Sequence, residues 1–561
     1  MKKLFLFTFL LTFLFIEPSL SQHPNSVSYP FLGDHKIPVT TLQAPDRITL
    51  EQEDANREHL GILYRIGVIN PLLLTPANGG MWTRLENGDR IWQTAIYYPG
   101  AEAISLFFDQ FKLSPLASLS VFDGKGNLLN EIYTATENSD QLVQHIPLCH
   151  SDYIVLQLTE PKNAAPSLIS LNEIGYIYRS SMMETFAKDF GESESCEINI
   201  NCPEGKDWQD EKKGIARILV RDGSFLGWCS GSLVNNTSND CTPYFLTAMH
   251  CGETATTSDF NQWIFYFAYE APDCTNPATQ GSLAATSKRI TGCHVKATSN
   301  DGGGDRGSDF FLLQLGSPAS KEATITKLKT YPIQAYWNGW DASNTAVSEG
   351  VGIHHPAGDI KKISKYVTAL TTSGWNANGL LSHWRVRWSS GVTEGGSSGS
   401  PLFNYNGGNS RIIGTLTGGN SSCGGSNPVD YYGKMYYHWD KNTTSGNIKL
   451  SQFLDPLNTG RVAIDGSYDP CNTGLSVPVM KSELIDATVY PNPFEDELLI
   501  SMNDIPGTYQ VSLYDVSGKL IHTESGTNNE LKIQTGKLNG GVYIIQIHSV
   551  HGTFVQKIIK Q

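Results

Sequence analysis

Alternation of apolar and polar residues runs along most of this chain and predicts β-strands rather than helices. Between residues 22 and 190, such runs cover residues 91–98, 103–113 and 153–158. The Asp123-Gly124-Lys125-Gly126 segment between two runs is typical of a hairpin turn. We therefore expect a β-rich, sandwich-like domain over residues 22–190, without a catalytic cluster of its own.

The end of the chain repeats this pattern on a smaller scale. Short apolar runs at residues 509–514, 531–533, 542–547 and 554–559 are separated by glycine-containing turns. A segment with serine, proline and glycine precedes them. This pattern predicts a linker at residues 468–487 and a small β-sandwich at residues 488–561.

The N-terminus predicts export. Lys2 and Lys3 precede an apolar run over residues 4–16, and small residues stand before a cleavage site after Ser21. Residues 1–21 are therefore expected to be a secretory signal peptide. No later segment reaches the roughly 18–20 apolar residues that a spanning helix needs, so we expect no stable membrane span.

Length, charge and cysteines narrow the class of protein. A chain of 561 residues suggests three or four domains, and a net charge of −14 argues against nucleic acid or an anionic membrane as partner. Eight of the ten cysteines lie within residues 191–467. In an exported chain without a Cys-x-x-Cys pair we expect disulfides rather than a metal site, and no cofactor.

Three short motifs within residues 191–467 carry the chemistry. His250 follows an apolar run, Asp309 precedes another, and Ser398 is the central serine of Gly396-Ser397-Ser398-Gly399. The order His, Asp, Ser is that of chymotrypsin-type serine proteases, not of subtilisins or α/β-hydrolases. His250 would take the proton of Ser398, Asp309 would orient His250, and the amides of Gly396 and Ser398 would form the oxyanion hole.

Each motif alone has a simpler interpretation. A glycine–serine cluster is more often a linker, a strand-end histidine is usually structural, and an aspartate before an apolar run is often a cap. The combination in this order favours the catalytic interpretation. The adjacent His354 and His355 are expected to be structural, because neighbouring side chains of an extended segment point to opposite faces.

Residues 191–467 resemble the bacterial lysyl endopeptidases. The shared segments are residues 202–205, 231–237, 244–251, 308–310, 339–341, 353–356, 391–394, 397–401, 454–456, 459–460 and 464–466. The resemblance implies an all-β, chymotrypsin-like double β-barrel, flanked here by the β-rich pro-domain (residues 22–190) and the C-terminal sandwich. It also implies the bridges Cys196–Cys423, Cys202–Cys274 and Cys229–Cys251. Cys241 and Cys293 stand outside the family's cysteine positions, and we expect them to pair with each other.

The resemblance also implies lysine specificity. Asp430 matches the aspartate that binds the substrate lysine, and Trp375 stands where the family has a tryptophan beside the pocket. The residue six before Ser398, which is the pocket aspartate in trypsin, is Val392 here. Before Gly418-Gly419 the family has a histidine, whereas this chain has Thr417. A broader preference, for Lys and Arg or other residues, therefore stays open.

The last block resembles the type A sorting domain of type IX secretion substrates through residues 489–494, 513–519, 540–543 and 557–560. It implies passage through the periplasm to the cell surface or the medium, with the type IX secretion machinery as partner. Together these features predict a secreted serine endopeptidase that cuts protein or peptide substrates after lysine. The alternative is a protease fold that has lost activity and acts as a binding or adhesin protein.

Ser397 also bears on activation. In animal relatives an aspartate precedes the nucleophile and pairs with the freed N-terminus, and uncharged Ser397 cannot do so. We expect instead a folding or inhibitory pro-domain that is clipped off near Lys188, with Arg179 as a possible earlier site.

Overall fold

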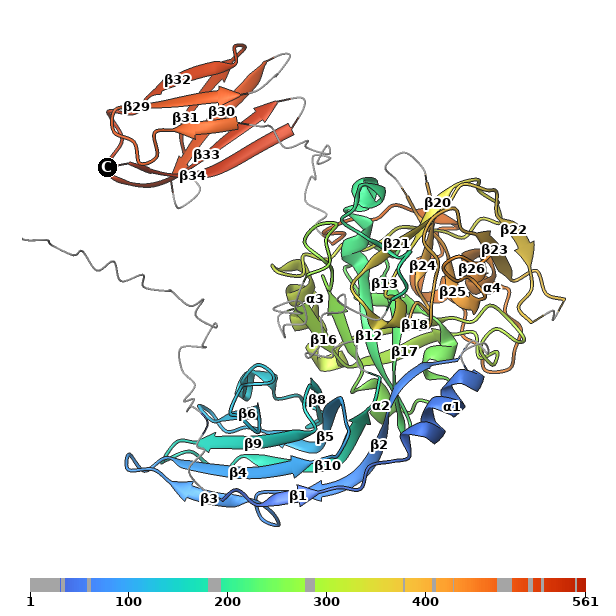
Figure 1. Cartoon of the computed structure of the whole chain (residues 1–561). Helices are drawn as coiled ribbons and strands as arrows, with labels where there is room; N and C mark the ends of the chain where they lie inside the picture. Colours follow the sequence, from blue (N-terminus) through green and yellow to red (C-terminus); the bar gives the residue numbers. More distant parts are fainter. Residues whose placement is uncertain are drawn as a thin grey trace, which may run out of the picture. The chain divides into compact units, whose positions relative to one another are not determined.

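The computed structural model describes residues 31, 36–57, 62–179, 193–277, 288–376, 379–405, 410–426, 428–471, 487–502, 508–515, 519–549 and 552–560. The expected signal peptide, the segment around Lys188 and most of the expected linker lie outside the described residues. The chain forms two compact units, residues 1–471 and 472–561 (Figure 1). The prediction of an all-β fold is confirmed.

Two sheets form the N-terminal part of the first unit, which is coloured blue and cyan in Figure 1. The first has the strand order β1-β4-β9-β6-β7, with β3 paired to β4. Its strands are β1 (Val39–Thr41), β3 (Met81–Arg84), β4 (Arg90–Tyr97), β6 (Ser118–Asp123), β7 (Tyr133–Thr134) and β9 (Tyr153–Glu160). The second contributes β2 (Tyr64–Leu74), β5 (Ala103–Lys112), β8 (Gln144–Cys149) and β10 (Leu168–Ile177). Apolar residues of both sheets, such as Trp92, Leu106 and Leu156, pack into one core.

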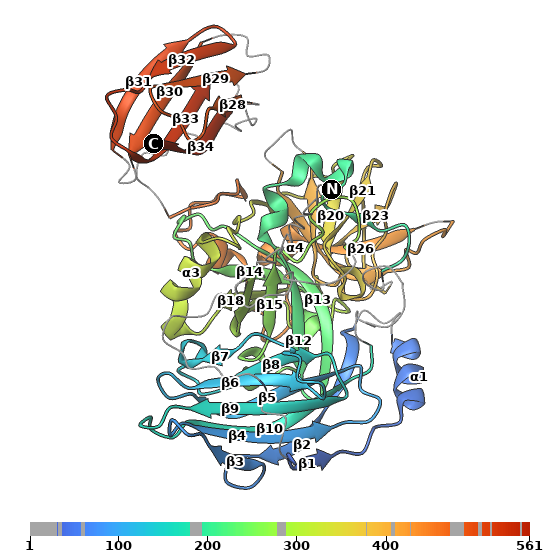
Figure 2. The ribbon, with the colours of Figure 1, turned by 60° about the vertical axis from the view of Figure 1, so that its left-hand side comes forward.

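The second of these sheets does not end at the N-terminal region. Strand β2 pairs antiparallel with β13, so the sheet runs on in the order β8-β5-β10-β2-β13-β12-β15-β16 (Figure 2). Gly227 makes the approach possible, because a Cβ atom there would lie 2.4 Å from the carbonyl oxygen of Tyr64. The region expected as a pro-domain therefore shares a continuous sheet with the region that follows it.

The first barrel surrounds an apolar core that includes Phe245, Phe265 and Leu313. Strands β14 and β18 pair with each other and connect β13 to β17. The barrel strands are β12 (Ile215–Asp222), β13 (Phe225–Leu233), β14 (Tyr244–Thr247), β15 (Ile264–Phe267), β16 (Arg289–Thr291), β17 (Cys293–Thr298) and β18 (Phe311–Leu315).

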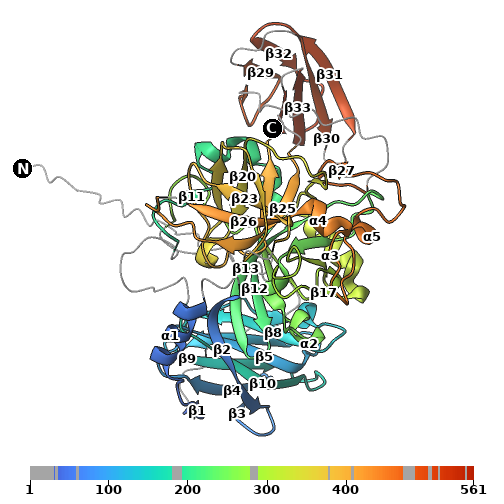
Figure 3. The same ribbon diagram turned by 90° about the vertical axis from the view of Figure 1, so that its right-hand side faces the viewer.

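The second barrel has the strand order β11-β21-β20-β24-β25-β26-β23-β22, with β19 and β27 beside β25 (Figure 3). Its strands are β11 (Ile198–Asn199), β19 (Trp340–Asp341), β20 (Gly350–His354), β21 (Lys362–Tyr366), β22 (Thr371–Ser373), β23 (His383–Arg387), β24 (Pro401–Asn404), β25 (Ile412–Gly419), β26 (Val429–Lys434) and β27 (Ala463–Ile464). Apolar residues of both barrels, among them Leu246, Leu312 and Ile353, pack into a shared core. The two barrels have the chymotrypsin-like arrangement that the sequence predicts.

Helices are short in the first unit. The α-helices are α1 (Arg47–Arg57), α2 (Thr257–Phe260), α3 (Lys321–Lys329), α4 (Met435–Asp440) and α5 (Ser451–Leu454). The 3-10 helices are η1 (Ala135–Glu137), η2 (Pro203–Trp208), η3 (Glu211–Gly214), η4 (Met249–Gly252), η6 (Pro318–Ser320) and η7 (Pro356–Gly358). No helix among the described residues is both long and apolar enough to cross a membrane.

The second unit is a small two-sheet sandwich with its own core, which includes Phe494, Leu513 and Ile545. One sheet has the order β28-β29-β32 and the other β31-β30-β33-β34. The strands are β28 (Ala487–Tyr490), β29 (Glu497–Met502), β30 (Tyr509–Asp515), β31 (Leu520–Gly526), β32 (Glu530–Gln534), β33 (Gly541–Ser549) and β34 (Gly552–Lys560).

The disulfides differ from expectation at one bridge. The structure contains Cys196–Cys423, Cys202–Cys274 and Cys229–Cys251. The expected Cys241–Cys293 bridge is wrong, because Cys241 pairs with Cys471 and Cys293 is a buried free thiol. The reason is tertiary. Ser467 pairs with Trp337 and brings Cys471 to Cys241, while Cys293 lies inside the first barrel against the carbonyl oxygen of Phe260. Cys149 is also free and buried.

Candidate active site

The structure brings His250 and Asp309 together between the two barrels. His250 lies in η4, directly after β14, and its Nδ1 is 2.7 Å from Asp309 Oδ2. The backbone N–H of His250 donates to the other carboxylate oxygen at 3.0 Å. Both side chains are fully buried. Asp309 therefore holds the imidazole in one orientation and leaves Nε2 free to exchange a proton. Among the described residues, this buried Nε2 has no hydrogen-bond partner.

Asp309 is held in a conformation that few non-glycine residues adopt. Its φ is +59°, and its N–H donates to Asp301 Oδ2 at 2.8 Å. Burial alone would raise the pKa of Asp309, but the charge and the hydrogen bonds of His250 outweigh burial and lower it. The pKa of Asp301 is raised by its burial and by the neighbouring Asp309 charge. Asp309 is thus the carboxylate that stays ionised beside the imidazole.

The loop that carries Ser398 is hydrogen-bonded to β13 and packs against the end of β14, which leads into His250. The N–H of Ser230, on β13, donates to the carbonyl of Ser398 at 2.8 Å, and the Ser230 hydroxyl donates to the carbonyl of Gly396 at 2.9 Å. A Cβ atom at Gly399 would lie 2.1 Å from Thr247 Oγ1, at the end of β14. Only glycine permits this approach, so the loop packs directly against the segment that leads into His250.

The same loop presents two amides at the expected oxyanion hole. Gly396 has a φ of +91°, and a Cβ there would crowd the backbone of residues 355–358 at 3.0–3.2 Å. Within the described part of the chain, neither the N–H of Gly396 nor that of Ser398 donates a hydrogen bond. Two such amides can stabilise a negatively charged oxygen. Cys229–Cys251 connects β13 to the residue after His250 and restrains the same region.

Asp430 lies on β26 opposite Gly419, and its side chain is buried. Its carboxylate accepts hydrogen bonds from Trp388 Nε1 at 2.5 Å, Thr393 Oγ1 at 2.8 Å and Ser421 Oγ at 2.6 Å. Burial raises the pKa of Asp430 despite these hydrogen bonds. A Cβ atom at Gly419 would lie 1.9 Å from Asp430 Oδ1, so glycine leaves that oxygen room at the edge of β25.

Trp375 and Thr417 lie close to Asp309. A Cβ atom placed at Gly304 would be 3.3 Å from Asp309 Cβ, 3.3 Å from Thr417 Cγ2 and 3.4 Å from Trp375 Cδ1. These three side chains therefore surround one glycine. Gly418 follows Thr417 on β25 and is paired with Tyr431.

His383 is a residue of this region that the sequence reasoning missed. Its Nε2 lies 3.0 Å from Thr417 Oγ1, and its ring is 6.3 Å from that of Trp375. Burial lowers the pKa of His383 to about 4, so the ring is neutral near pH 7. It comes from β23, and no local motif marks it. The family has a histidine at the position of Thr417. In this chain a histidine from another strand, His383, contacts that position instead.

His354 and His355 are buried and their rings contact different partners, as the sequence predicts for structural histidines. His354 Nδ1 lies 2.8 Å from Ser397 Oγ, and His355 Nδ1 lies 2.9 Å from the carbonyl of Asp359. Burial lowers the pKa of His354 to about 3. Each histidine therefore supports the backbone around the nucleophile loop as a neutral ring. In the part of the chain described, two clusters of metal-ligand type occur, and two of the three members of each form a disulfide.

Two further features lie next to the loop, and the sequence did not predict the contacts that they make. Glu394 packs near Glu197, and burial raises the pKa of Glu394 to about 7. The ring of Tyr64, on β2, covers Gly395, where a Cβ atom would lie 2.2 Å from the tyrosine Cδ2. The N-terminal region thus contacts the residue just before the oxyanion loop.

Comparison with known proteins assigns two segments. Residues 190–433 match the family "Lysyl endopeptidase, C-terminal domain". The central region is therefore similar to the C-terminal domain of lysyl endopeptidases. Residues 488–561 match the "Secretion system C-terminal sorting domain", which indicates secretion or export to the cell surface. Both resemblances drawn from the sequence are confirmed.

The lysyl endopeptidase of Pseudomonas aeruginosa is 29% identical to this chain over 300 residues, covering 51% of this chain and 59% of the relative. The chain therefore spans about three-fifths of the length of that relative. Among solved structures, the protease Anisep of Arthrobacter nicotinovorans is 18% identical, with a TM-score of 0.29, and covers 43% of this chain and 93% of that one. The thermostable serine protease AL20 from an extremophilic microorganism is 14% identical, with a TM-score of 0.28, and covers 42% of this chain and 100% of that one.

Proposed function

We propose that this chain is a secreted serine endopeptidase that hydrolyses peptide bonds on the carboxyl side of lysine. The observation that carries the proposal is the buried His250–Asp309 pair beside the glycine-rich loop of Ser398. Asp430 is the carboxylate proposed to bind the lysine ammonium, with Trp375, Thr417 and Gly418 along the path to it. Substrates are proteins or peptides.

In the proposed reaction, His250 Nε2 removes the proton of Ser398 Oγ as this oxygen attacks the carbonyl carbon of the substrate. The negative charge that develops on the carbonyl oxygen is stabilised by the N–H groups of Gly396 and Ser398. His250 then donates the proton to the leaving amine, and water hydrolyses the acyl-enzyme by the same route in reverse order. Asp309 stabilises the imidazolium at each stage.

The test of the nucleophile is covalent labelling with a fluorophosphonate. The mature enzyme is expected to be labelled at Ser398, and Ser398→Ala should remain folded while kcat falls by about 10⁶-fold. Ser400→Ala, in the same loop, is the matched control for labelling. An unlabelled, inactive wild-type enzyme would favour the alternative of a binding or adhesin protein.

Specificity is tested separately by digesting one denatured protein and sequencing the new termini. Cleavage after lysine alone is expected if Asp430 and its surroundings select the ammonium group. Cleavage after both lysine and arginine would instead point to the substitution of the family's histidine by Thr417.

We also infer processing and export. Residues 22–190 would act as a folding or inhibitory pro-domain, a role supported by the contact of Tyr64 with Gly395. Residues 488–561 would be recognised by the type IX secretion machinery and removed. N-terminal sequencing of active enzyme tests the first inference, with a start between residues 180 and 191 expected. An active form that begins at Gln22 and has no internal break contradicts it.

A further inference from the structure

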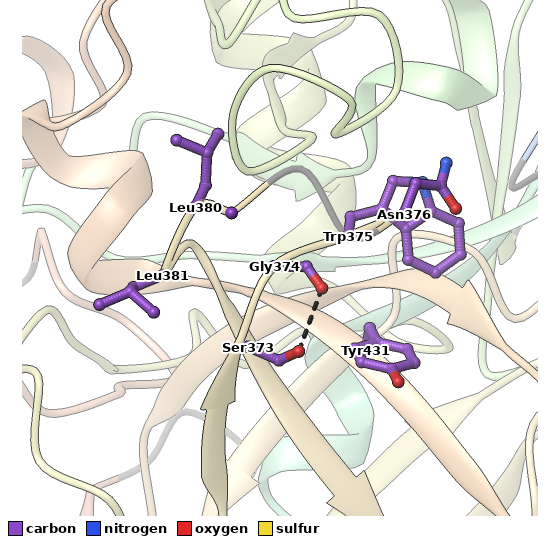
Figure 4. A pocket seen from close by; sticks show the side chains of 8 residues that line it. Ser373, Gly374, Trp375, Asn376, Leu380, Leu381 and Tyr431 are labelled. Atoms are coloured by element: carbon purple, nitrogen blue, oxygen red, sulfur yellow. Dashed lines mark hydrogen bonds between the residues drawn. The ribbon is translucent and has the colours of Figure 1, made fainter.

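A shallow cavity of about 590 Å³ lies beside the proposed catalytic centre, where the loop between β22 and β23 leaves the second barrel (Figure 4). Its lining residues are Ser373, Gly374, Trp375, Asn376, Gly379, Leu380, Leu381 and Tyr431. In Figure 4, Trp375 and Tyr431 border it on one side and Leu380 and Leu381 on the other. Apart from Trp375, its lining residues have no role in the chemistry described so far.

Trp375 and Tyr431 make this cavity continuous with the active site. Trp375 shares the space around Gly304 with Asp309 and Thr417. Tyr431 follows Asp430 directly on β26 and is paired with Gly418. The rings of Trp375 and Tyr431 contact each other edge to face, with centroids 5.8 Å apart. The cavity is therefore within reach of substrate residues that lie a few positions from the bond attacked by Ser398.

Strand β25 supplies the edge on which such a peptide can lie. One side of β25 is paired with β26 as far as Gly419, whereas its pairing with β24 ends at Thr415. Leu416 then exchanges hydrogen bonds with the nucleophile loop at Gly399 and Ser400. Among the described strands, none pairs with the second side of β25 beyond this point. An extended peptide can add there as a further strand, next to Ser398.

Alternation of side chains decides which substrate residues reach the cavity. Asp430 points to Trp388, Thr393 and Ser421, while the ring of its neighbour Tyr431 points to Trp375. Successive side chains of an added strand point to opposite faces in the same way. If the lysine before the scissile bond points to Asp430, the second and fourth residues upstream of that bond (P2 and P4) point to the Tyr431 side.

The lining residues select the chemistry of the occupant. None of those named above carries a charge, and Leu381 exposes 67% of its surface beside two aromatic rings. We propose that this cavity is a substrate subsite that binds an apolar side chain at P4, or at P2, of peptides cut after lysine. The proposal rests on the proposed function, which it extends from the cleaved residue to the sequence before it.

The experiment uses the mature enzyme and short peptides with lysine before the scissile bond. Leucine is compared with serine at P2, P3 and P4 in turn, and kcat/KM is measured for each. Leucine is expected to raise kcat/KM about fivefold or more at P4 or P2, while P3, on the opposite face, serves as the internal control. An equal effect at all three positions, or none, overturns the subsite. Failure to cut any lysine peptide refutes the proposed function instead.

A variant confirms the location. Leu380→Ser combined with Leu381→Ser should reduce the leucine-to-serine ratio at the sensitive position towards one. Leu457→Ser is the matched control, because Leu457 is equally exposed, at 68%, and does not line the cavity. An unchanged ratio in the double variant places the selection elsewhere and contradicts the assignment.

Discussion

At the scale of single residues, the buried Asp430 and the partly buried Glu394 differ in how their charge is compensated. Asp430 accepts three side-chain hydrogen bonds at 2.5–2.8 Å. Glu394 accepts the N–H of Glu194 at 2.9 Å and interacts with Glu197, and both contacts lower its pKa, but burial outweighs them and raises it. Burial raises the pKa of both groups, so Asp430 would gain from a cationic ligand that compensates its charge, whereas Glu394 holds a proton up to about pH 7.

Asp430→Asn should abolish the proposed preference for lysine. The amide retains the shape of the carboxylate, but a lysine ammonium that enters the pocket then has no counter-charge. Loss of one partner of a desolvated pair costs about 3–5 kcal/mol, so kcat/KM for lysine peptides should fall by about 10²–10⁴-fold. Asp273→Asn, an exposed carboxylate on the other barrel, is the control. Undiminished cleavage after lysine would place the pocket acid elsewhere.

Glu394 makes stability depend on pH in a defined direction. Because its pKa is raised from 4.5 to about 7, the folded state binds this proton more tightly than the unfolded chain does. The stability it contributes is complete below about pH 4.5 and is lost as the pH rises through 7.

Glu394→Gln stays neutral and should escape this loss. We expect it to equal the parent at pH 4.5 and to exceed it by about 1–3 kcal/mol at pH 8, in urea unfolding on a Ser398→Ala background that prevents self-digestion. Glu349→Gln, at an exposed position of the same barrel, should show no such difference. A gain that is the same at both pH values would mean that the carboxyl group is not responsible.

At the scale of elements, β13 and β14 hold the histidine segment and the serine loop together, and Cys229–Cys251 fastens this arrangement. The two cysteines are 22 residues apart in sequence. Replacement of both by alanine should lower the free energy of unfolding by about 3 kcal/mol, because the unfolded chain regains the freedom of that loop. Urea unfolding measures the change.

Cys293→Ala is the control for that bridge, since Cys293 is a buried free thiol of the same barrel. It should cost less than half as much. Peptide mapping without reduction adds a direct check on connectivity and should recover Cys241 joined to Cys471. A Cys241–Cys293 peptide would contradict the structure.

At the scale of the whole molecule, the N-terminal region shares a sheet and a core with the first barrel. Ile66, Phe107 and Ile177 pack with Leu226, Trp228 and Tyr266 across the shared sheet. Arg221 of the barrel also forms an ion pair with Glu173 of the N-terminal region, with 2.8 Å between Nη1 and Oε2, so the interface includes a polar interaction. Cleavage of the chain between them does not break these interactions.

We therefore expect the N-terminal fragment to stay bound after processing. Size-exclusion chromatography of freshly clipped Ser398→Ala enzyme, cut by an added protease, should show both fragments in one peak that separates in denaturant. Tyr64→Ala, which removes the ring on Gly395, should leave the fragments together while exposing the nucleophile loop. Leu73→Ser, an exposed residue of the same strand, is its control. Immediate separation of the fragments under native conditions would contradict a shared sheet.

The sequence by itself determined the features that depend on short stretches of chain. Alternation along residues such as 91–98 predicted strands, and β4 spans Arg90–Tyr97. Turn glycines and strand ends marked His250, Asp309 and Ser398, because a tight turn needs glycine next to the residue that it presents. The family resemblance supplied three bridges that the structure contains.

Only the tertiary structure decided which distant segments meet. Cys241 pairs with Cys471 across 230 residues, His383 reaches Thr417 from another strand, and Tyr64 covers Gly395 from the N-terminal region. Cysteine spacing, strand periodicity and turn chemistry describe neighbours along the chain and contain no information on contacts between distant residues. They arise because the packing of two barrels and a continuous sheet brings together surfaces whose complementarity no local pattern records.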